Sequence, residues 1–126
     1  MSYKPDGYNS ASPYLLVTDA AGTIRFLEQV LGATLLHSHP GEAGRILHAE
    51  VRIDDSVVML ADAAPGWPAV PAHVHVYVPD VDAVYARALQ AGAEPVQAPT
   101  RKDDEDRRGG VRDAGGTTWW ISTRVG

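Results

Sequence analysis

The chain has 126 residues, of which 44% are hydrophobic, which suits a single globular domain with a buried core. Its formal net charge is −5 and its basic residues are scattered, so a nucleic-acid partner has no electrostatic support. The absence of cysteine excludes disulfide bonds and thiolate metal sites. The N-terminus has no apolar leader and no run of about 18 apolar residues occurs, so we predict a cytoplasmic protein that does not associate with membranes.

The first half of the chain is predicted to place one helix among four strands, after a polar N-terminal arm. Asp19 is a favoured N-cap residue, and Gly32 stands where a helix commonly ends in a left-handed glycine. The third strand alternates, so Leu47 is predicted to share a face with Ala49 and Val51, away from His48 and Glu50. The predicted elements are strand 13–17, helix 19–31 and strands 34–39, 46–53 and 56–61.

The second half repeats this plan after a proline-rich connector at 62–72. Pro95 favours an edge position for its second strand, because proline cannot donate to a sheet ladder. The charge-dense segment 101–108 is predicted to be a solvated excursion in which opposite charges offset one another. The predicted elements are strand 73–78, helix 80–91, strand 94–98 and a last hairpin of 110–112 with 117–123.

The two halves match at a nearly constant offset. Asp19 and Asp80 are 61 positions apart, and Gly32 and Gly92 are 60 apart. A repeat that occurs twice indicates a duplicated module. We therefore predict an α+β fold in one domain, 1–126, built from two βαβββ modules at about 12–62 and 73–124. Their curved sheets are predicted to form a cup with the helices on the outer face, and the inner face is where a ligand would bind.

Five segments carry a resemblance to a known superfamily. They resemble the vicinal-oxygen-chelate superfamily, which includes glyoxalase I, bleomycin-resistance proteins and extradiol dioxygenases. Within it, the chain is most similar to small phosphonate-operon-type and drug-binding proteins. The resemblance covers nearly the whole chain and implies the cup-shaped fold and a homodimer. Its segments are Pro13–Val17, His48–Ile53, Asp55–Asp62, His75–Val84 and Trp119–Trp120.

The resemblance also implies where metal ligands would stand in metal-dependent members. Those four positions hold Ser12, Met59, His73 and Trp120 here, and only His73 suits a divalent metal. We therefore predict no metal and no cofactor. The alternative is a site in which His73 and His75 chelate a metal together, with His48 or Glu50 completing it.

Strand alternation predicts which side chains line the cup. The lining is aromatic with a few polar groups, as expected for a site that holds a planar, partly polar molecule. Alternatively, the aromatic residues only fill the space between the sheets, and a tryptophan in the connector either plugs the rim or closes over a ligand. The predicted ligand-binding residues are Tyr14, Leu16, His48, Glu50, Met59, Trp67, His73, His75, Tyr77, Trp120 and Ser122.

These observations predict a small-molecule binding protein that sequesters a hydrophobic aromatic compound such as an antibiotic. The alternative is a metal-dependent lyase, isomerase or thiol transferase of the same superfamily, and a regulatory module without a ligand is a third class. No nucleophile–base pair or phosphate loop is evident, and no catalytic residue is predicted. Glu50 is the residue best suited to act as a base.

Overall fold

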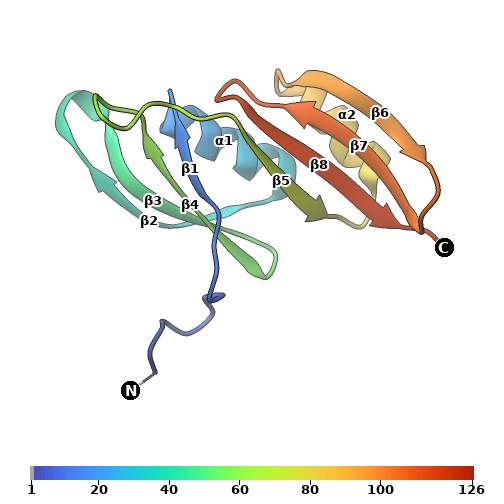
Figure 1. The fold of residues 1–126 in the computed structure, drawn as a ribbon, viewed down its shortest axis with the longest axis horizontal. Helices are drawn as coiled ribbons and strands as arrows, with labels where there is room; N and C mark the ends of the chain where they lie inside the picture. Colours follow the sequence, from blue (N-terminus) through green and yellow to red (C-terminus); the bar gives the residue numbers. More distant parts are fainter. Residues whose placement is uncertain (1) are drawn as a thin grey trace. The chain divides into compact units, whose positions relative to one another are not determined.

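The computed structural model describes residues 2–126, which divide into two compact units, one ending at Val70 and the other beginning at Pro71. Each unit contains one α-helix and one four-stranded sheet, and Figure 1 shows the elements of both. The first unit comprises β1 (Tyr14–Val17), α1 (Ala20–Leu31), β2 (Thr34–Pro40), η1 (Glu42–Gly44), β3 (Ile46–Ile53) and β4 (Ser56–Asp62). The second comprises β5 (Ala72–Tyr77), α2 (Val81–Gln90), β6 (Glu94–Arg101), β7 (Asp106–Arg112) and β8 (Thr117–Arg124).

The first sheet has the strand order β1-β4-β3-β2, with β1 parallel to β4 and the other pairs antiparallel. One face packs against α1 and forms the apolar core of the unit. Burial of this apolar surface is the main force that holds helix and sheet together. The buried side chains include Leu15, Val17, Ala49, Val51 and Leu60 of the sheet and Ile24, Phe26, Leu27 and Val30 of the helix.

The ends of α1 are fixed as the sequence predicts. The Asp19 side chain accepts a hydrogen bond from the Gly22 backbone N–H at 3.1 Å, which caps the N-terminus. Gly32 closes the C-terminus with φ of 64°, a left-handed conformation that glycine adopts without a Cβ clash. The helix therefore begins and ends where its capping residues stand.

A β-bulge in β3 overturns one prediction about side-chain direction. On β2, His39 pairs with His48 and Pro40 pairs with Ile46, so Leu47 has no partner. A bulged residue leaves the regular alternation and can re-aim its side chain. Leu47 is 52% exposed, whereas Ala49 and Val51 are fully buried. The predicted common face for these three residues is therefore wrong for Leu47.

The second sheet repeats the first, with the order β5-β8-β7-β6 and a parallel β5–β8 pair. The face that packs against α2 buries Val81, Val84 and Ala88 of the helix with Trp119 and Ile121 of β8. The strand β6 lies at the sheet edge, as Pro95 predicts.

The turn between β7 and β8 is tied together by one buried carboxylate. Asp113 accepts hydrogen bonds from the Gly115 and Thr117 backbone N–H groups at 3.0 and 3.1 Å. It also accepts one from the Trp119 indole Nε1 at 2.8 Å. Asp113 thus anchors the largest buried side chain of the unit.

The prediction of a solvated excursion at 101–108 is wrong at its C-terminal end. The strand β7 begins at Asp106, and β6 extends to Arg101, so the turn between them covers only 102–105. Asp106 is 9% exposed, and Arg108 pairs across the sheet with Ser122. The density of charge favours a solvated loop, but Asp106 and Arg108 instead pair with each other on the sheet.

In each unit, a side chain near the end of the last strand accepts a hydrogen bond from the first backbone N–H of the helix. The Asp62 side chain, at the end of β4, accepts from the Ala20 N–H at 2.7 Å. The Thr123 hydroxyl, 61 positions further along in β8, accepts from the Val81 N–H at 2.9 Å. These repeated contacts and the repeated strand order confirm the α+β class and the two βαβββ modules. In the described part of the chain, no helix is long and apolar enough to cross a membrane.

Candidate functional site

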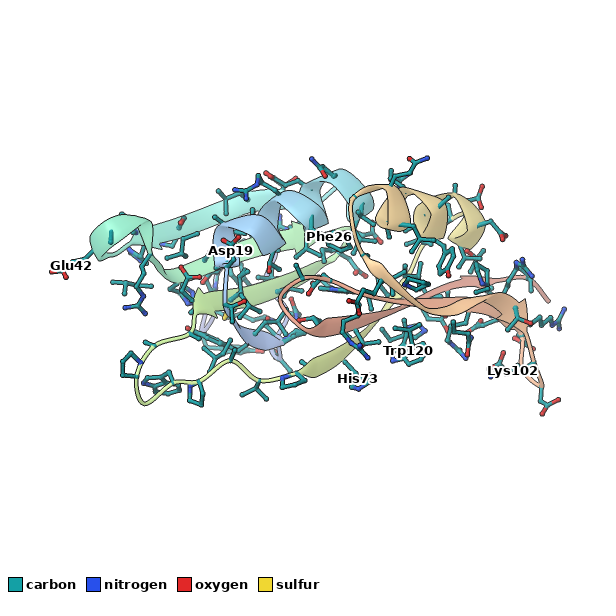
Figure 2. All side chains as sticks on the ribbon, turned by 90° about the horizontal axis from the view of Figure 1, so that it is seen from above. Asp19, Phe26, Glu42, His73, Lys102 and Trp120 are labelled. Carbon is teal, nitrogen blue, oxygen red and sulfur yellow. The ribbon has the colours of Figure 1, made fainter. Side chains whose placement is uncertain are left out.

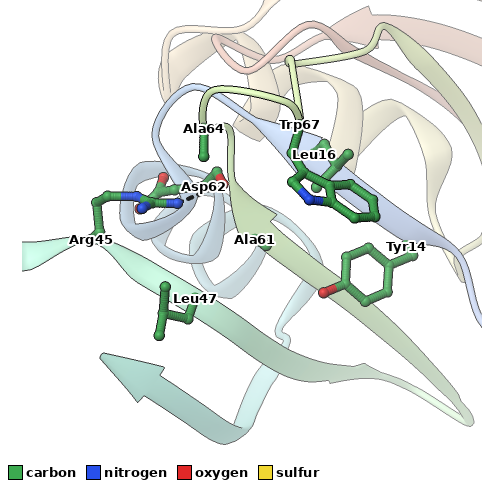
Figure 3. Close-up of a pocket in the computed structure, with 8 residues that line it drawn as sticks. All are labelled: Tyr14, Leu16, Arg45, Leu47, Ala61, Asp62, Ala64 and Trp67. Atoms are coloured by element: carbon green, nitrogen blue, oxygen red, sulfur yellow. Dashed lines mark hydrogen bonds between the residues drawn. The ribbon is translucent and has the colours of Figure 1, made fainter. Parts of the chain in front are cut away.

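A pocket of about 500 Å³ lies on the open face of the first sheet, which we define as the face opposite α1 (Figure 3). This volume falls in the range of small-molecule sites, and most of the walls are apolar. Tyr14 and Leu16 reach it because they alternate with the buried Leu15 and Val17 along β1. Its lining residues are Tyr14, Leu16, Arg45, Leu47, Ala61, Asp62, Ala64 and Trp67.

A tight turn in the connector places Trp67 against the pocket. Ala64 and Trp67 exchange two backbone hydrogen bonds, each 2.8 Å long. Pro65 and Gly66 occupy the corner, and Gly66 has φ of 83°, as the third residue of a type II turn requires. The indole is 67% exposed and lies beside Leu16 (Figure 3), so it borders the pocket and does not fill the core.

Arg45 and Asp62 form the polar end of the pocket. Both carboxylate oxygens of Asp62 are occupied, one by the Ala20 N–H and the other by the Ile46 N–H, each at 2.7 Å. The Arg45 guanidinium donates only a long hydrogen bond of 3.5 Å to the Asp62 carbonyl oxygen (Figure 3). Its Nε atom is buried and has no acceptor among the described residues. A buried unsatisfied donor costs about 1–3 kcal/mol, so this end of the pocket favours an acceptor.

His48 and Glu50 lie on the same open face but are engaged by neighbours. His48 Nε2 donates to a Glu50 carboxylate oxygen at 2.8 Å, and in the neutral ring Nδ1 accepts from the Tyr14 hydroxyl at 3.1 Å. The second carboxylate oxygen of Glu50 accepts a hydrogen bond from Tyr8 of the N-terminal arm. The Arg52 guanidinium also donates to the Gly7 carbonyl oxygen at 3.1 Å, which ties the arm to β3.

These contacts determine what Glu50 can do chemically. The Tyr8 hydroxyl and then His48 hold the pKa of the Glu50 carboxyl below its usual range, outweighing the opposing effect of burial. A carboxylate with a lowered pKa is a weaker base, and both of its oxygens already accept hydrogen bonds. Glu50 therefore anchors the arm and orients His48 and Tyr14.

The open face of the second sheet, opposite α2, carries Trp120 and His73 (Figure 2). The Trp120 indole Nε1 donates to His73 Nδ1 at 3.0 Å, and the two ring planes differ by only 8°. Trp120 lies over Gly110, where an added Cβ would stand 2.7 Å from the indole ring. Glycine at this position allows the indole to lie flat, so Trp120 and His73 form one planar aromatic surface.

A chain of hydrogen bonds occupies the rest of this face. The Tyr77 hydroxyl donates to Asp106 at 2.7 Å, and an Arg108 terminal nitrogen donates to the same oxygen at 3.2 Å. Arg108 Nε donates to the Ser122 hydroxyl oxygen at 2.9 Å, and Ser122 pairs with His75 Nε2 at 2.9 Å. Polar groups that satisfy one another in this way make a rigid surface.

The surroundings of His75 disfavour its charged form. Partial burial is the largest cause of its lowered pKa, and the Arg108 cation adds to it, while Asp106 opposes it. In the neutral ring, Nε2 accepts the hydrogen bond from Ser122, whose own oxygen accepts from Arg108. His75 is thus held as a hydrogen-bonded member of the face.

The structure brings the predicted site residues together in two groups. Tyr14, Leu16 and Trp67 border the pocket, with His48 and Glu50 beside it and Met59 paired with Tyr14 and Glu50. His73, His75, Tyr77, Trp120 and Ser122 share the open face of the second sheet.

Sequence reasoning missed several residues at both places. An acidic residue at the end of an apolar strand signals Asp62, which closes the pocket, but no sequence signal marks the bulge that exposes Leu47. The missed residues are Arg45, Leu47, Ala61, Asp62 and Ala64 at the pocket and Asp106 and Arg108 on the second sheet.

The residues at the superfamily's metal-ligand positions do not fit a divalent cation. Ser12 accepts a hydrogen bond from the Asn9 side chain at 3.2 Å, and His73 Nδ1 accepts from Trp120. The thioether of Met59 and the indole of Trp120 are not ligands for Mg²⁺ or Zn²⁺. Within residues 2–126, no cluster of three or more histidine and acidic side chains could hold a metal ion.

The chain is similar to proteins of known sequence and structure. The uncharacterized protein Mb0911c of Mycobacterium bovis is 38% identical over 125 residues, which covers 90% of this chain and 82% of that protein. The crystal structure of TioX from Micromonospora sp. ML1 shares 27% identity, with a TM-score of 0.75 over 92% of this chain and 100% of that one. TnmS3, an antibiotic binding protein from Streptomyces sp. CB03234, shares the fold at 23% identity and a TM-score of 0.70, covering 92% and 97%. Residues 9–121 match the Glyoxalase/Bleomycin resistance protein/Dioxygenase superfamily, and the chain belongs to this superfamily.

Proposed function

We propose that the protein binds a planar aromatic small molecule, such as an antibiotic, and that the pocket of the first unit is its main site. The observation that carries this proposal is the pocket of about 500 Å³ between Trp67 and the open face of the sheet. Tyr14 and Trp67 offer a flat molecule aromatic contacts, and Leu16 and Leu47 offer aliphatic ones. TnmS3, which shares the fold, is an antibiotic binding protein, and that supports the ligand class.

The fixed position of Trp67 supports binding over simple packing. An indole that is 67% exposed contributes little to the core, yet its turn holds it against the pocket by two backbone hydrogen bonds. Holding an aromatic wall in place before binding lowers the entropic cost of binding. The Trp120–His73 surface offers the same class of ligand a separate, weaker place to bind on the second unit, in line with the predicted role of Trp120.

The engagement of His48 and Glu50 gives them a supporting role in this proposal. They hold the Tyr14 hydroxyl through His48, so the Tyr14 ring keeps its place at the pocket wall. The enzymatic alternative needs a base, and the lowered pKa of Glu50 weakens the best candidate. We therefore favour binding without turnover.

A homodimer remains part of the proposal. Leu35 on the edge strand β2 is 43% exposed, and Val96 on the edge strand β6 is 39% exposed. Apolar side chains on edge strands are suited to pairing with a second chain. Light scattering that gives a monomer at high protein concentration would remove the dimer from the proposal and leave ligand binding untouched.

Isothermal titration with naphthalene-2-carboxylate tests the function. The unaltered protein is expected to bind, and Leu47→Asn is expected to weaken binding about tenfold because it places an amide in the apolar wall. Val70→Asn is the matched control, since Val70 and Leu47 are both 52% exposed and Val70 does not line the pocket. No binding by the unaltered protein, or equal loss in both variants, would contradict the proposal.

A further inference from the structure

We infer that the pocket selects aromatic ligands that carry a carboxylate, and that Arg45 is the residue that recognises it. This inference rests on the proposed function and adds the chemical class of the ligand. Arg45 stands at the polar end of a pocket whose other walls are mostly apolar. Its guanidinium carries five donors in a planar fork that matches the two oxygens of a carboxylate.

Arg45 is fixed at the base of its side chain. Its backbone N–H donates to the Glu42 carbonyl oxygen at 3.1 Å, and its carbonyl oxygen accepts from the Gly41 N–H at 2.7 Å. These bonds close the η1 turn around it. The side chain then leaves the turn toward Asp62 at the pocket end, as Figure 3 shows. The constrained backbone therefore directs the guanidinium toward the pocket.

The guanidinium lacks partners that other arginines of the chain have. Arg107, Arg108, Arg112 and Arg124 each pair with a carboxylate at 2.7–3.6 Å. Arg45 makes no ion pair within 4.0 Å among residues 2–126, and its side-chain donors reach only the Asp62 carbonyl oxygen at 3.5 Å. Its buried Nε has no acceptor in the same part of the chain.

The nearby Asp62 does not satisfy this charge. Each of its carboxylate oxygens already accepts a backbone N–H at 2.7 Å, from Ala20 and from Ile46. One lone pair of each oxygen is directed to these donors, which hold the start of α1 and of β3. The Asp62 carboxylate makes no ion pair with Arg45, and a molecule bound on the pocket side would supply the acceptor that Asp62 does not.

Two ring-matched probes test the inference, naphthalene-2-carboxylate and 2-methylnaphthalene. They share the flat body and differ only in the carboxylate. The unaltered protein is expected to bind the acid at least tenfold more tightly than the hydrocarbon, and Arg45→Met is expected to remove that preference. Equal affinity of the two probes for the unaltered protein would overturn the inference and leave the proposed function standing. Failure of both probes to bind would overturn the two together.

A second measurement uses the unaltered protein alone and does not depend on how the variant folds. The buried Nε–H of Arg45 is shielded from solvent, so we expect its ¹H–¹⁵N resonance to be observable. The carboxylate probe is expected to shift this resonance, and the methyl probe is expected to leave it near its starting position. Arg107, whose Nε–H donates to the Asp82 carboxylate at 2.9 Å, supplies a control Nε resonance that neither probe moves. An Arg45 resonance that stays fixed while the acid binds would overturn the inference.

Discussion

The open faces of the two sheets are built from equivalent positions but have become different surfaces. Strand pairing relates several pocket residues of the first unit to hydrogen-bonded residues of the second. Arg45 stands 61 positions before Asp106. Leu47 is the extra residue of the bulge, so His48, which follows it, is the equivalent of Arg108. Asp106 and Arg108 pair with each other at 3.2 Å. Tyr14, Leu16 and Ala61 correspond to His75, Tyr77 and Ser122 in the same network.

The difference shows what turns a sheet face into a pocket. In the second unit, the polar side chains are long enough to hydrogen-bond one another, and together they cover the open face of the sheet. In the first unit, Ala61 stands at the place of Ser122, the bulge adds Leu47 to the face, and Arg45 is left without a carboxylate. The same backbone plan therefore yields a surface of mutually hydrogen-bonded side chains in the second unit. In the first unit it yields a pocket in which the Arg45 guanidinium has no ion-pair partner.

The largest effect on stability is expected at the side-chain hydrogen bond to the helix start, which both units share. Asp62→Ala leaves the Ala20 and Ile46 N–H groups without their acceptor, and we expect a loss of about 2–4 kcal/mol in the free energy of unfolding. Thr123→Ala removes the acceptor of one N–H, that of Val81, and is expected to cost about 1–2 kcal/mol. Urea unfolding measures both, and Asp62→Asn, which keeps one acceptor oxygen, should fall between them. An equal cost for the two alanine variants would contradict the extra role of Asp62.

Removing the cation of the second face breaks the comparison directly. Arg108→Leu puts an apolar side chain where the hydrogen-bonded network has its guanidinium. It leaves Asp106, which is 9% exposed, with only the Tyr77 side chain as a donor to its carboxylate, and we expect a loss of about 1–3 kcal/mol in urea unfolding. The double variant Asp106→Leu with Arg108→Leu should recover part of that loss, because no buried charge remains unpaired. A single variant as stable as the original would show that the network does not stabilise this face.

Ligand binding should depend on the two tryptophan surfaces to different extents. Trp67→Ala removes a pocket wall and is expected to weaken binding of naphthalene-2-carboxylate by about 1–2 kcal/mol, or roughly 5- to 30-fold. Trp120→Ala is expected to weaken only a separate, weaker association at the second sheet, by about twofold to fivefold, and His73→Ala by less. Titration calorimetry on the three variants ranks them. The reverse ranking would move the main site to the second unit.

The smallest effect concerns the pH dependence of the second face. His75 has a pKa below its ordinary 6.5 in the folded protein, so the unfolded chain binds the proton more readily. This contribution to stability is fully present above pH 6.5 and is lost as the pH falls through the folded pKa. Urea midpoints between pH 6.5 and 5 should therefore decline, and the decline should be shallower in His75→Gln. The lowered pKa of Glu50 contributes mainly around and below its ordinary 4.5, so its effect in this window is small and is the same in both proteins. An identical decline in both proteins would assign it to other groups.

The fold could be predicted from the sequence because its signals are local and repeated. Asp19 and Gly32 mark the ends of α1, the valines of β5 mark a strand, and the offset between the halves reveals the duplication. The capping and alternation signals each lie within a few residues, and the offset only compares one half with the other, so no contact between distant residues had to be known. The same alternation correctly assigned Tyr14 and Leu16 to the open face.

The pocket could not be predicted fully because it depends on contacts between distant residues. The bulge that exposes Leu47 arises from the pairing of β2 with β3, and the sequence of β3 alone alternates without a break. Arg45 and Asp62 meet only after η1 and β4 come together, 17 positions apart in the chain. The charges at 106–108 looked solvated because their partners Tyr77 and Ser122 lie in other strands.

One spectrum tests the central claim, because each of the three tryptophans stands in a different environment. Trp67 borders the pocket, Trp120 lies on the open face of the second sheet, and Trp119 is buried with its indole N–H bonded to Asp113. On titration with naphthalene-2-carboxylate, the indole ¹H–¹⁵N resonance of Trp67 is expected to move most, that of Trp120 less, and that of Trp119 not at all. A Trp67 resonance that stays fixed while the probe binds would contradict the assignment of the ligand site to the first unit.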